Sequence, residues 1–153
     1  AGVQLIEYNA RFGDPEAMNV LSILDSDFIE ICEAIISENL NNTKIIFKNL
    51  ATVCKYAVPD GYPDDPVRGH QIDVSEVKDK NMLFYASVEN KNGSLIQIGS
   101  RAIASVGHGE TIWEAEQIAE TKILKVKGPL FHRKDIGTTD LIQKKINNMS
   151  SLK

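Results

Sequence analysis

The chain has 153 residues, of which 42% are hydrophobic and 25% charged, and its formal net charge is −4 with an isoelectric point near 5.4. These values are typical of an ordinary globular protein, and the acidic balance with dispersed basic residues argues against nucleic acid as a partner. The sequence contains no apolar run that could span a membrane and no sign of a secretory leader, so we expect no membrane partner for this segment. Its two cysteines, interpreted as thiols, indicate a reducing cytoplasm.

The first element expected along the chain is a β-strand that ends in alternating polar residues. Residues 3–6 are rich in apolar and β-branched side chains, and Glu7, Asn9 and Arg11 follow at every second position. Side chains two apart on a strand point to the same face. A carboxylate and an amide oxygen suit Mg²⁺, and an arginine matches phosphate as a fork. The pattern predicts a metal–nucleotide edge, and the alternative is an exposed strand end with scattered polar residues.

The next three residues, Asp14, Pro15 and Glu16, have the types found at a helix start. Asp14 is expected as the N-cap and Pro15 at the first helical position. A cap role alone would explain an aspartate at position 14. Contact with a substrate is the alternative interpretation, and the sequence favours neither. Glu16 is favoured in a first helical turn by the helix dipole, whatever else it does.

A longer helix is expected from about residue 25 to residue 40. Its apolar stripe consists of Phe28, Ile31, Ile35 and Ile36. The asparagine-rich residues 39–42 end this helix and indicate a linker, so we place a boundary between a first part, residues 1–42, and a second part, residues 43–153.

The second part alternates predicted strands with two helices. Strands are expected at residues 50–58, 82–90, 94–99 and 101–106, with a hairpin turn at residues 91–93. Thr111 and Glu114 form a capping box that opens a helix to about residue 127, buried through Trp113, Ala115, Ile118, Ala119 and Ile123. An amphipathic helix follows at about residues 140–149. The expected fold class is α+β, an antiparallel sheet with helices on one face.

Glycines, histidines and cysteines carry weaker signals. Gly107 and Gly109 are expected to form a tight turn before the helix, with anion binding as the second interpretation. The three histidines form no recognisable constellation. Cys32 and Cys54 have no metal-ligand spacing, so we interpret both as buried thiols, with zinc or a disulfide as lesser alternatives.

Several stretches resemble one enzyme family. Residues 7–11 are similar to the Glu-x-Asn-x-Arg motif of ATP-grasp ligases. Their continuation through residues 11–16 resembles the signature of the phosphoribosylamine–glycine ligase family. Residues 61–63, 107–115 and 133–137 agree with the C-terminal part of that family, in family order.

This resemblance implies a fold and an activity. Residues 1–42 would be the C-terminal end of an ATP-grasp domain, and residues 43–153 a small α+β C-terminal domain. The whole enzyme would join glycine to phosphoribosylamine with ATP, through glycyl phosphate, in the second step of de novo purine biosynthesis. An N-terminal part of the same polypeptide would be required, so this chain alone is expected to be inactive.

The resemblance also implies roles for single residues. Glu7 and Asn9 would hold Mg²⁺ or Mn²⁺ between nucleotide phosphates, Arg11 would stabilise the transferred phosphate, and Asp14 would face glycine or the amine. Glu16 is a further candidate for substrate binding. Arg133 and Lys134 would hold a sugar phosphate, although Thr138 and Thr139 stand where the family often has an aromatic residue and an arginine. The alternative interpretation of residues 133–137 is a solvated basic loop.

Two other functions are open. The chain could be a non-catalytic binding module whose loops dock a partner protein, with the motif at residues 7–11 accidental. It could also belong to another ATP-grasp carboxylate–amine ligase or a related carboxylase. The continuation through residues 13–16 argues against the carboxylase, because carboxylating relatives carry other residues there.

Overall fold

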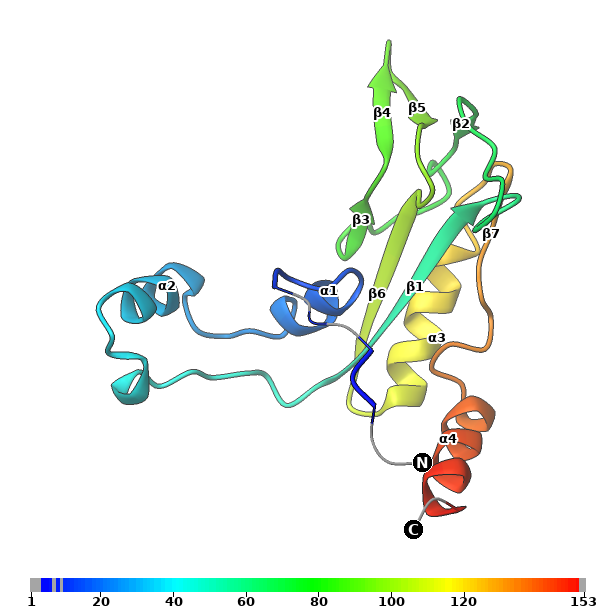
Figure 1. Cartoon of the computed structure of the whole chain (residues 1–153). Helices are drawn as coiled ribbons and strands as arrows, with labels where there is room; N and C mark the ends of the chain where they lie inside the picture. The colour runs from blue at the N-terminus through cyan, green and yellow to red at the C-terminus, as the bar shows by residue number, and fades with distance from the viewer. Residues whose placement is uncertain (1–3, 7, 9, 152–153) are drawn as a thin grey trace.

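The computed structural model describes residues 4–6, 8 and 10–151, which form two antiparallel sheets and several helices (Figure 1). The helices are α1 (Glu16–Leu21), α2 (Phe28–Ile36), the 3₁₀ helix η1 (Leu40–Asn42), α3 (Ile112–Ile123) and α4 (Thr139–Ser151). The strands are β1 (Ala51–Pro59), β2 (Gln71–Ile72), β3 (Leu83–Tyr85), β4 (Val88–Lys91), β5 (Ser94–Gln97), β6 (Ile103–Gly109) and β7 (Leu130–Phe131). No helix of the described chain combines the length and the apolar character needed to cross a bilayer.

The larger sheet has the strand order β3-β6-β1-β7, and the smaller one has the order β2-β5-β4. Strands β1 and β6 form the long central pair, in register from Ala51 opposite Gly109 to Ala57 opposite Ile103. All of the paired strands are antiparallel. The expected fold class, α+β with an antiparallel sheet, is therefore confirmed.

Helix α3 packs closely on one face of the larger sheet, and two strand glycines make this approach possible. A Cβ on Gly107 would lie 1.9 Å from the carbonyl oxygen of Ala115, and one on Gly109 would lie 2.8 Å from the Ala115 nitrogen. Glycine is the residue that lets two backbones come this near. Gly107 and Gly109 thus lie at the end of β6, and the expectation of a tight turn there was wrong.

The close approach also selects the buried side of α3. Ala115, Ala119 and Ile123 are buried, one helical turn apart, against β1 and β6. Trp113 is 60% exposed, because it lies about 200° around the helix from Ala115. Ile118 is also exposed, at 46%, so the prediction that these two larger side chains are buried was wrong.

The capping and turn predictions hold in detail. The hydroxyl of Thr111 accepts from the Glu114 N–H at 3.2 Å, while the Glu114 carboxylate reaches the Glu110 N–H at 2.9 Å. Strands β4 and β5 are joined by Asn92 and Gly93, both with positive φ, as expected for a two-residue hairpin turn. The strand expected over residues 82–90 is instead divided into β3 and β4. The chain bends at residues 86–87, so the two strands join different sheets.

The first part of the chain differs more from expectation. Residues 4–6 are not in a strand, because no other described segment offers them a ladder to pair with. Val3, Glu7 and Asn9 lie outside the described residues. Helix α1 lies on the sheet face opposite α3, where Met18 packs against Cys54, Ala104 and Val106.

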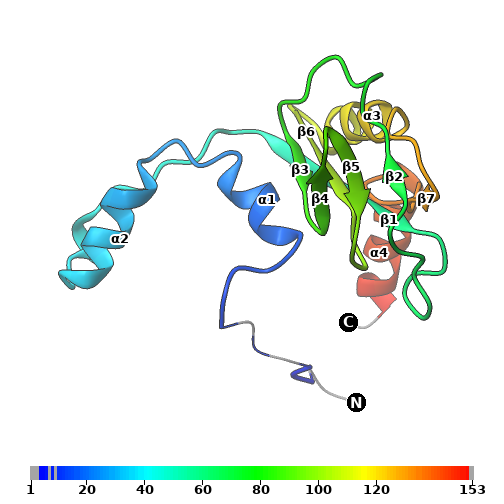
Figure 2. The same cartoon turned by 90° about the horizontal axis from the view of Figure 1, so that it is seen from above.

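Helix α2 lies on an arm that extends away from the sheets (Figures 1 and 2). The two sides of the arm are joined by a bridge between Leu24 and Phe47. Asp27 caps α2 by accepting from the Ile29 and Glu30 N–H groups, so the helix is shorter than expected. Within the expected apolar stripe, Ile31 is buried, whereas the others are exposed: Phe28, Ile35 and Ile36. The boundary at residue 42 stays a prediction.

We predict that Gly107→Ala lowers the free energy of unfolding by about 1–3 kcal/mol or more, because its Cβ must displace the α3 backbone. Urea unfolding of the chain measures the change. The matched control is Ser105→Ala in the same strand, which removes a buried hydroxyl that has no hydrogen-bond partner among the described residues. Equal effects of the two substitutions would contradict the close-packing explanation.

Candidate functional site

A pocket of about 420 Å³ lies on the sheet face opposite α3. It is formed by the start of α1, β1, the loop after β1, the segment just before β6, and β7 with its following loop. Its lining residues are Pro15, Cys54, Tyr56, Val58, Tyr62, Pro63, Arg101, Phe131, Arg133 and Ile136. The walls are mostly apolar and aromatic, and two guanidinium groups supply positive charge. Such a pocket can enclose a small anionic ligand.

The alternation of β1 directs side chains into this pocket. Cys54, Tyr56 and Val58 are two residues apart and share the pocket face, whereas Val53 and Lys55 point to α3. Burial raises the pKa of the Cys54 thiol to about 12, and the negative charges of Asp14 and Glu16 add to this shift. The charges of both carboxylates of the 14–16 stretch therefore act on the Cys54 thiol.

Asp14 binds Arg101 at the rim of the pocket. Its carboxylate lies 2.9 Å from the Arg101 Nη1, and the same nitrogen donates to the Asp14 backbone carbonyl at 2.9 Å. The Arg101 guanidinium also lies over the Tyr56 ring, 5.6 Å from its centroid. Helix α1 has Pro15 at its N-cap position and no side-chain cap. The prediction that Asp14 caps this helix was therefore wrong, because Arg101 occupies its carboxylate.

The tyrosines complete this cluster. Burial raises the pKa of the Tyr56 hydroxyl above its usual range, and the charge and hydrogen bond of Asp14 raise it further. Tyr56 is therefore neutral at physiological pH. Partial burial acts to lower the pKa of Arg101, but the hydrogen bond with Tyr62 and the charge of Asp14 outweigh it and raise that pKa.

Arg133 and Lys134 face different surroundings. Arg133 lines the pocket and forms a fork with Asp135, through Nε at 3.0 Å and Nη2 at 2.6 Å. The hydrogen bonds from Arg133 lower the pKa of Asp135, so this carboxylate is charged. Lys134 instead lines a separate shallow hollow beside Asp140 and Lys144. Only one cation of the predicted pair therefore reaches the pocket.

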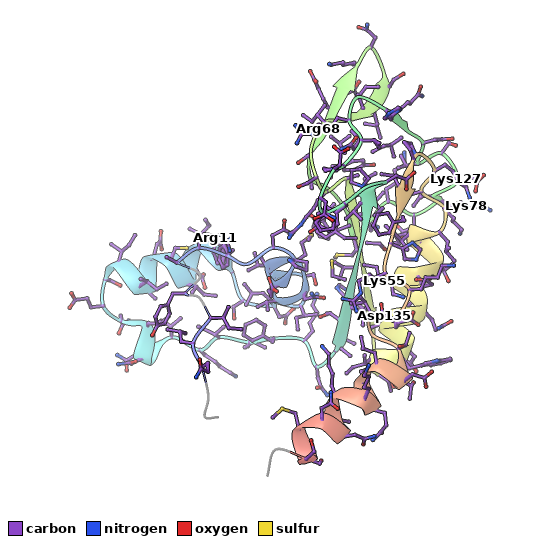
Figure 3. All side chains as sticks on the ribbon, turned by 45° about the vertical axis from the view of Figure 1, so that its right-hand side comes forward. Arg11, Lys55, Arg68, Lys78, Lys127 and Asp135 are labelled. Carbon is purple, nitrogen blue, oxygen red and sulfur yellow. The ribbon has the colours of Figure 1, made fainter. Side chains whose placement is uncertain are left out.

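A buried ion cluster behind β1 holds the loop that carries Arg133. The Lys55 side chain has no exposed surface, and its Nζ lies 2.5 Å from Glu116, 2.6 Å from Glu120 and 2.9 Å from the Lys134 carbonyl oxygen. His132 bonds to the same Glu120 carboxylate at 3.0 Å. Figure 3 shows Lys55 between β1 and α3 with Asp135 nearby. Residues 132–134 are thus tied to the sheet and to α3.

The other predicted site residues are placed as follows. Glu7 and Asn9 lie outside the described residues. Arg11 is exposed, on the side of the molecule where α1 and α2 lie (Figure 3), and its Nη1 donates to the Phe12 carbonyl oxygen at 3.2 Å. Glu16 is exposed in the first turn of α1.

Metal ligation can be examined only in the rest of the chain. Within residues 4–6, 8 and 10–151, no group of three or more histidine, cysteine, aspartate or glutamate residues could hold a metal ion. Cys54 is buried as expected, Cys32 is only half-buried, and both are free thiols. His108 and His132 have polar partners in Ser22 and Glu120.

Sequence reasoning missed Arg101, Tyr56, Tyr62 and Lys55. Lys55 carried a usable signal, because it is the one charged residue in the apolar strand β1, and such a residue needs a buried partner. Tyr56 had the right alternation with Cys54 and Val58. Nothing in the sequence pairs Arg101 with Asp14, because 87 positions separate them.

Comparisons with known proteins identify one matching family and several similar enzymes. The family described as phosphoribosylglycinamide synthetase, C domain, matches residues 52–139. The phosphoribosylamine–glycine ligase of Methanocaldococcus jannaschii is 55% identical over 99% of the chain and 35% of its own length. That of Methanosarcina acetivorans is 48% identical over the full chain and 34% of its own length. The chain thus spans about a third of the length of these relatives.

A solved structure supports the same relationship. The crystal structure of the phosphoribosylamine–glycine ligase from Thermotoga maritima superposes with a TM-score of 0.64 at 29% sequence identity. The superposition covers 86% of this chain and 32% of that one. The fold of most of this chain therefore recurs in a solved ligase of this name.

We predict that Cys54 is far less reactive than Cys32 toward a thiol reagent such as dithionitrobenzoate. Raising a thiol pKa from 9.0 to about 12 lowers the thiolate fraction at neutral pH about a thousandfold. Each of the variants Cys32→Ser and Cys54→Ser keeps one thiol, so its reaction rate at neutral pH reports on that thiol alone. Unfolding in urea should make the two rates equal. Comparable native rates would contradict the burial of Cys54 under the 14–16 stretch.

We also predict an acid-sensitive contribution to stability from Glu120. Burial acts to raise the pKa of this group, but hydrogen bonds from Lys55 and His132 outweigh it and lower that pKa below 4.5. The stabilisation is fully present above the unfolded value of 4.5 and is lost as pH falls through the folded value. Urea unfolding at several acidic pH values should show a shallower loss in Glu120→Gln than in the exposed control Glu110→Gln.

Proposed function

The chain belongs to the phosphoribosylglycinamide synthetase C-domain family, and we propose that it is the C-terminal part of an ATP-dependent ligase that joins glycine to phosphoribosylamine. The observation that carries this proposal is the agreement with phosphoribosylamine–glycine ligases over 99% of the chain at 55% identity. A binding module with an accidental motif would not match enzymes over both of its parts. The products would be glycinamide ribonucleotide, ADP and phosphate.

The proposed reaction has two steps. The glycine carboxylate attacks the terminal phosphorus of ATP, the bond to ADP breaks, and glycyl phosphate forms. The amine of phosphoribosylamine then attacks the glycyl carbonyl carbon, loses a proton, and releases phosphate as the amide bond forms. Such chemistry needs positioned groups and charge neutralisation more than a nucleophile from the protein.

Residues of the chain are assigned to these steps as proposals. Glu7 and Asn9 offer the carboxylate and amide oxygens that suit Mg²⁺ or Mn²⁺, which would neutralise phosphate charge. Arg11 would stabilise the phosphate during transfer. Asp14 would face glycine or the amine from the rim of the pocket, and Arg133 lines that pocket as the group for a sugar phosphate.

The remainder of the site is assigned to the upstream part of the same polypeptide. That part would be the rest of an ATP-grasp domain and would bind ATP. Apolar side chains of the arm are exposed in this chain, as Ile36 is at 83% and Ile29 at 63%, and contact with the upstream part would cover them. The free cysteines agree with a reducing cytoplasm as the compartment.

We predict that Glu7→Gln and Asn9→Ala in the full-length ligase lower turnover about 10²-fold or more and raise the Mg²⁺ concentration required. Each substitution weakens or removes an oxygen ligand near developing phosphate charge. Steady-state rates across a magnesium series measure both effects, with Glu89→Gln in the exposed strand β4 as the control. Unchanged rates at limiting Mg²⁺ in both variants, or ligase activity of the isolated chain, would refute the proposal.

A further inference from the structure

Arg101 joins the rigid sheet to the stretch that carries the motif. We propose that it is a positioning residue, which holds the turn at residues 13–16 against the pocket and thereby sets where the motif before that turn lies. This inference rests on the proposed function, because it assigns Arg101 a role in the same site. Arg101 was not among the residues that the sequence singled out.

The sheet side of this connection is well anchored. Arg101 lies two positions before β6, and its own carbonyl oxygen accepts from the Ser87 N–H at 3.0 Å. The next residue, Ala102, has no exposed surface and donates its N–H to the Ala57 carbonyl oxygen of β1 at 3.1 Å. The Arg101 backbone is therefore held by the bend between β3 and β4 and, through Ala102, by β1, so its side chain starts from a defined place.

The turn at residues 13–16 has fewer other contacts to hold it than the sheet has, so its position depends more on Arg101. Residues 13–16 belong to no strand, and α1 has no side-chain cap. The guanidinium binds both the carboxylate and the backbone carbonyl of Asp14, each at 2.9 Å. Because Arg101 binds both the side chain and the backbone of Asp14, it fixes the orientation of the turn as well as its distance from the sheet. Only two residues separate Asp14 from Arg11.

An isolated surface ion pair would contribute little, because solvent screens it. The Arg101 and Asp14 side chains are 36% and 51% exposed, so their attraction alone would not justify a positioning role. Neighbouring aromatic side chains strengthen the contact beyond that of an isolated ion pair. Tyr56 lies under the guanidinium, whose central carbon is 5.6 Å from the ring centroid, and Tyr62 and Pro15 line the same pocket as Arg101. The ion pair is therefore packed against protein on its pocket side, where solvent screens it less.

Hydrogen exchange in the isolated chain tests the positioning without any activity. The Ala17 and Met18 amides bond to the Gly13 and Pro15 carbonyl oxygens at 2.9 and 3.1 Å. We expect these amides to exchange about tenfold faster in Arg101→Met and in Asp14→Asn, and β1 amides to stay unchanged. The control is Arg68→Met, which removes an exposed guanidinium from the loop before β2 (Figure 3). Equal exchange in Arg101→Met and Arg68→Met would overturn the inference.

A double-mutant cycle in the full-length ligase then separates positioning from substrate contact. Positioning predicts that Arg101→Met lowers kcat about 10- to 100-fold, that Asp14→Asn does the same, and that the double variant is no worse than either. Arg101→Lys should retain more of kcat, and Arg68→Met should behave as wild type. A rise in the KM for phosphoribosylamine with unchanged kcat would overturn positioning in favour of direct contact. An inactive wild-type ligase would instead refute the proposed function, and the exchange result would still decide the role of Arg101.

Discussion

A charge buried in the central strand constrains the rest of this structure. Lys55 lies in β1 with no exposed side-chain surface, and a buried ammonium is tolerated only when its partners replace the lost water. Glu116 and Glu120 on α3 and the carbonyl oxygen of Lys134 supply those partners. Together with the close approach at Gly107 and Gly109, this group determines which side of α3 faces the sheet, and it fixes where the chain after β7 returns. The loop that carries Arg133 takes its position from an interaction on the opposite face of the sheet.

Strand β1 separates two kinds of environment by its alternation. Lys55 faces α3 with its carboxylate partners, while Cys54 and Tyr56 face the pocket, where burial and the nearby Asp14 raise their pKa values. The pocket face therefore keeps its thiol and phenol neutral. Its positive charge comes from Arg101 and Arg133 at the rim. Each guanidinium is paired with a carboxylate, Arg101 with Asp14 and Arg133 with Asp135, so the sugar phosphate that we propose would meet forked hydrogen-bond donors and no large net positive charge.

The pocket also joins parts of the chain that are distant in sequence. Pro15 and Asp14 come from the start of the chain, Arg101 from the middle, and Arg133 from the loop after β7. The arm that carries α2 contributes no lining residue to it, and several apolar side chains on the arm are exposed. We therefore assign the two parts different roles. The sheet with its pocket would position a substrate, and the arm would complete an ATP-grasp domain with the upstream polypeptide.

The sequence by itself determined the elements whose signals are local. The alternating apolar strand β1, the Asn92–Gly93 hairpin and the Thr111 cap each depend on neighbouring residues, and all three are found as predicted. The family also followed from short contiguous motifs. Tertiary structure alone decided what Asp14, Gly107 and Trp113 do. Asp14 has the local features of a helix cap, yet its carboxylate binds Arg101, 87 positions away, and α1 has no side-chain cap. Gly107 and the exposed Trp113 reflect how closely α3 approaches β6, and that distance depends on packing between elements that no local pattern records.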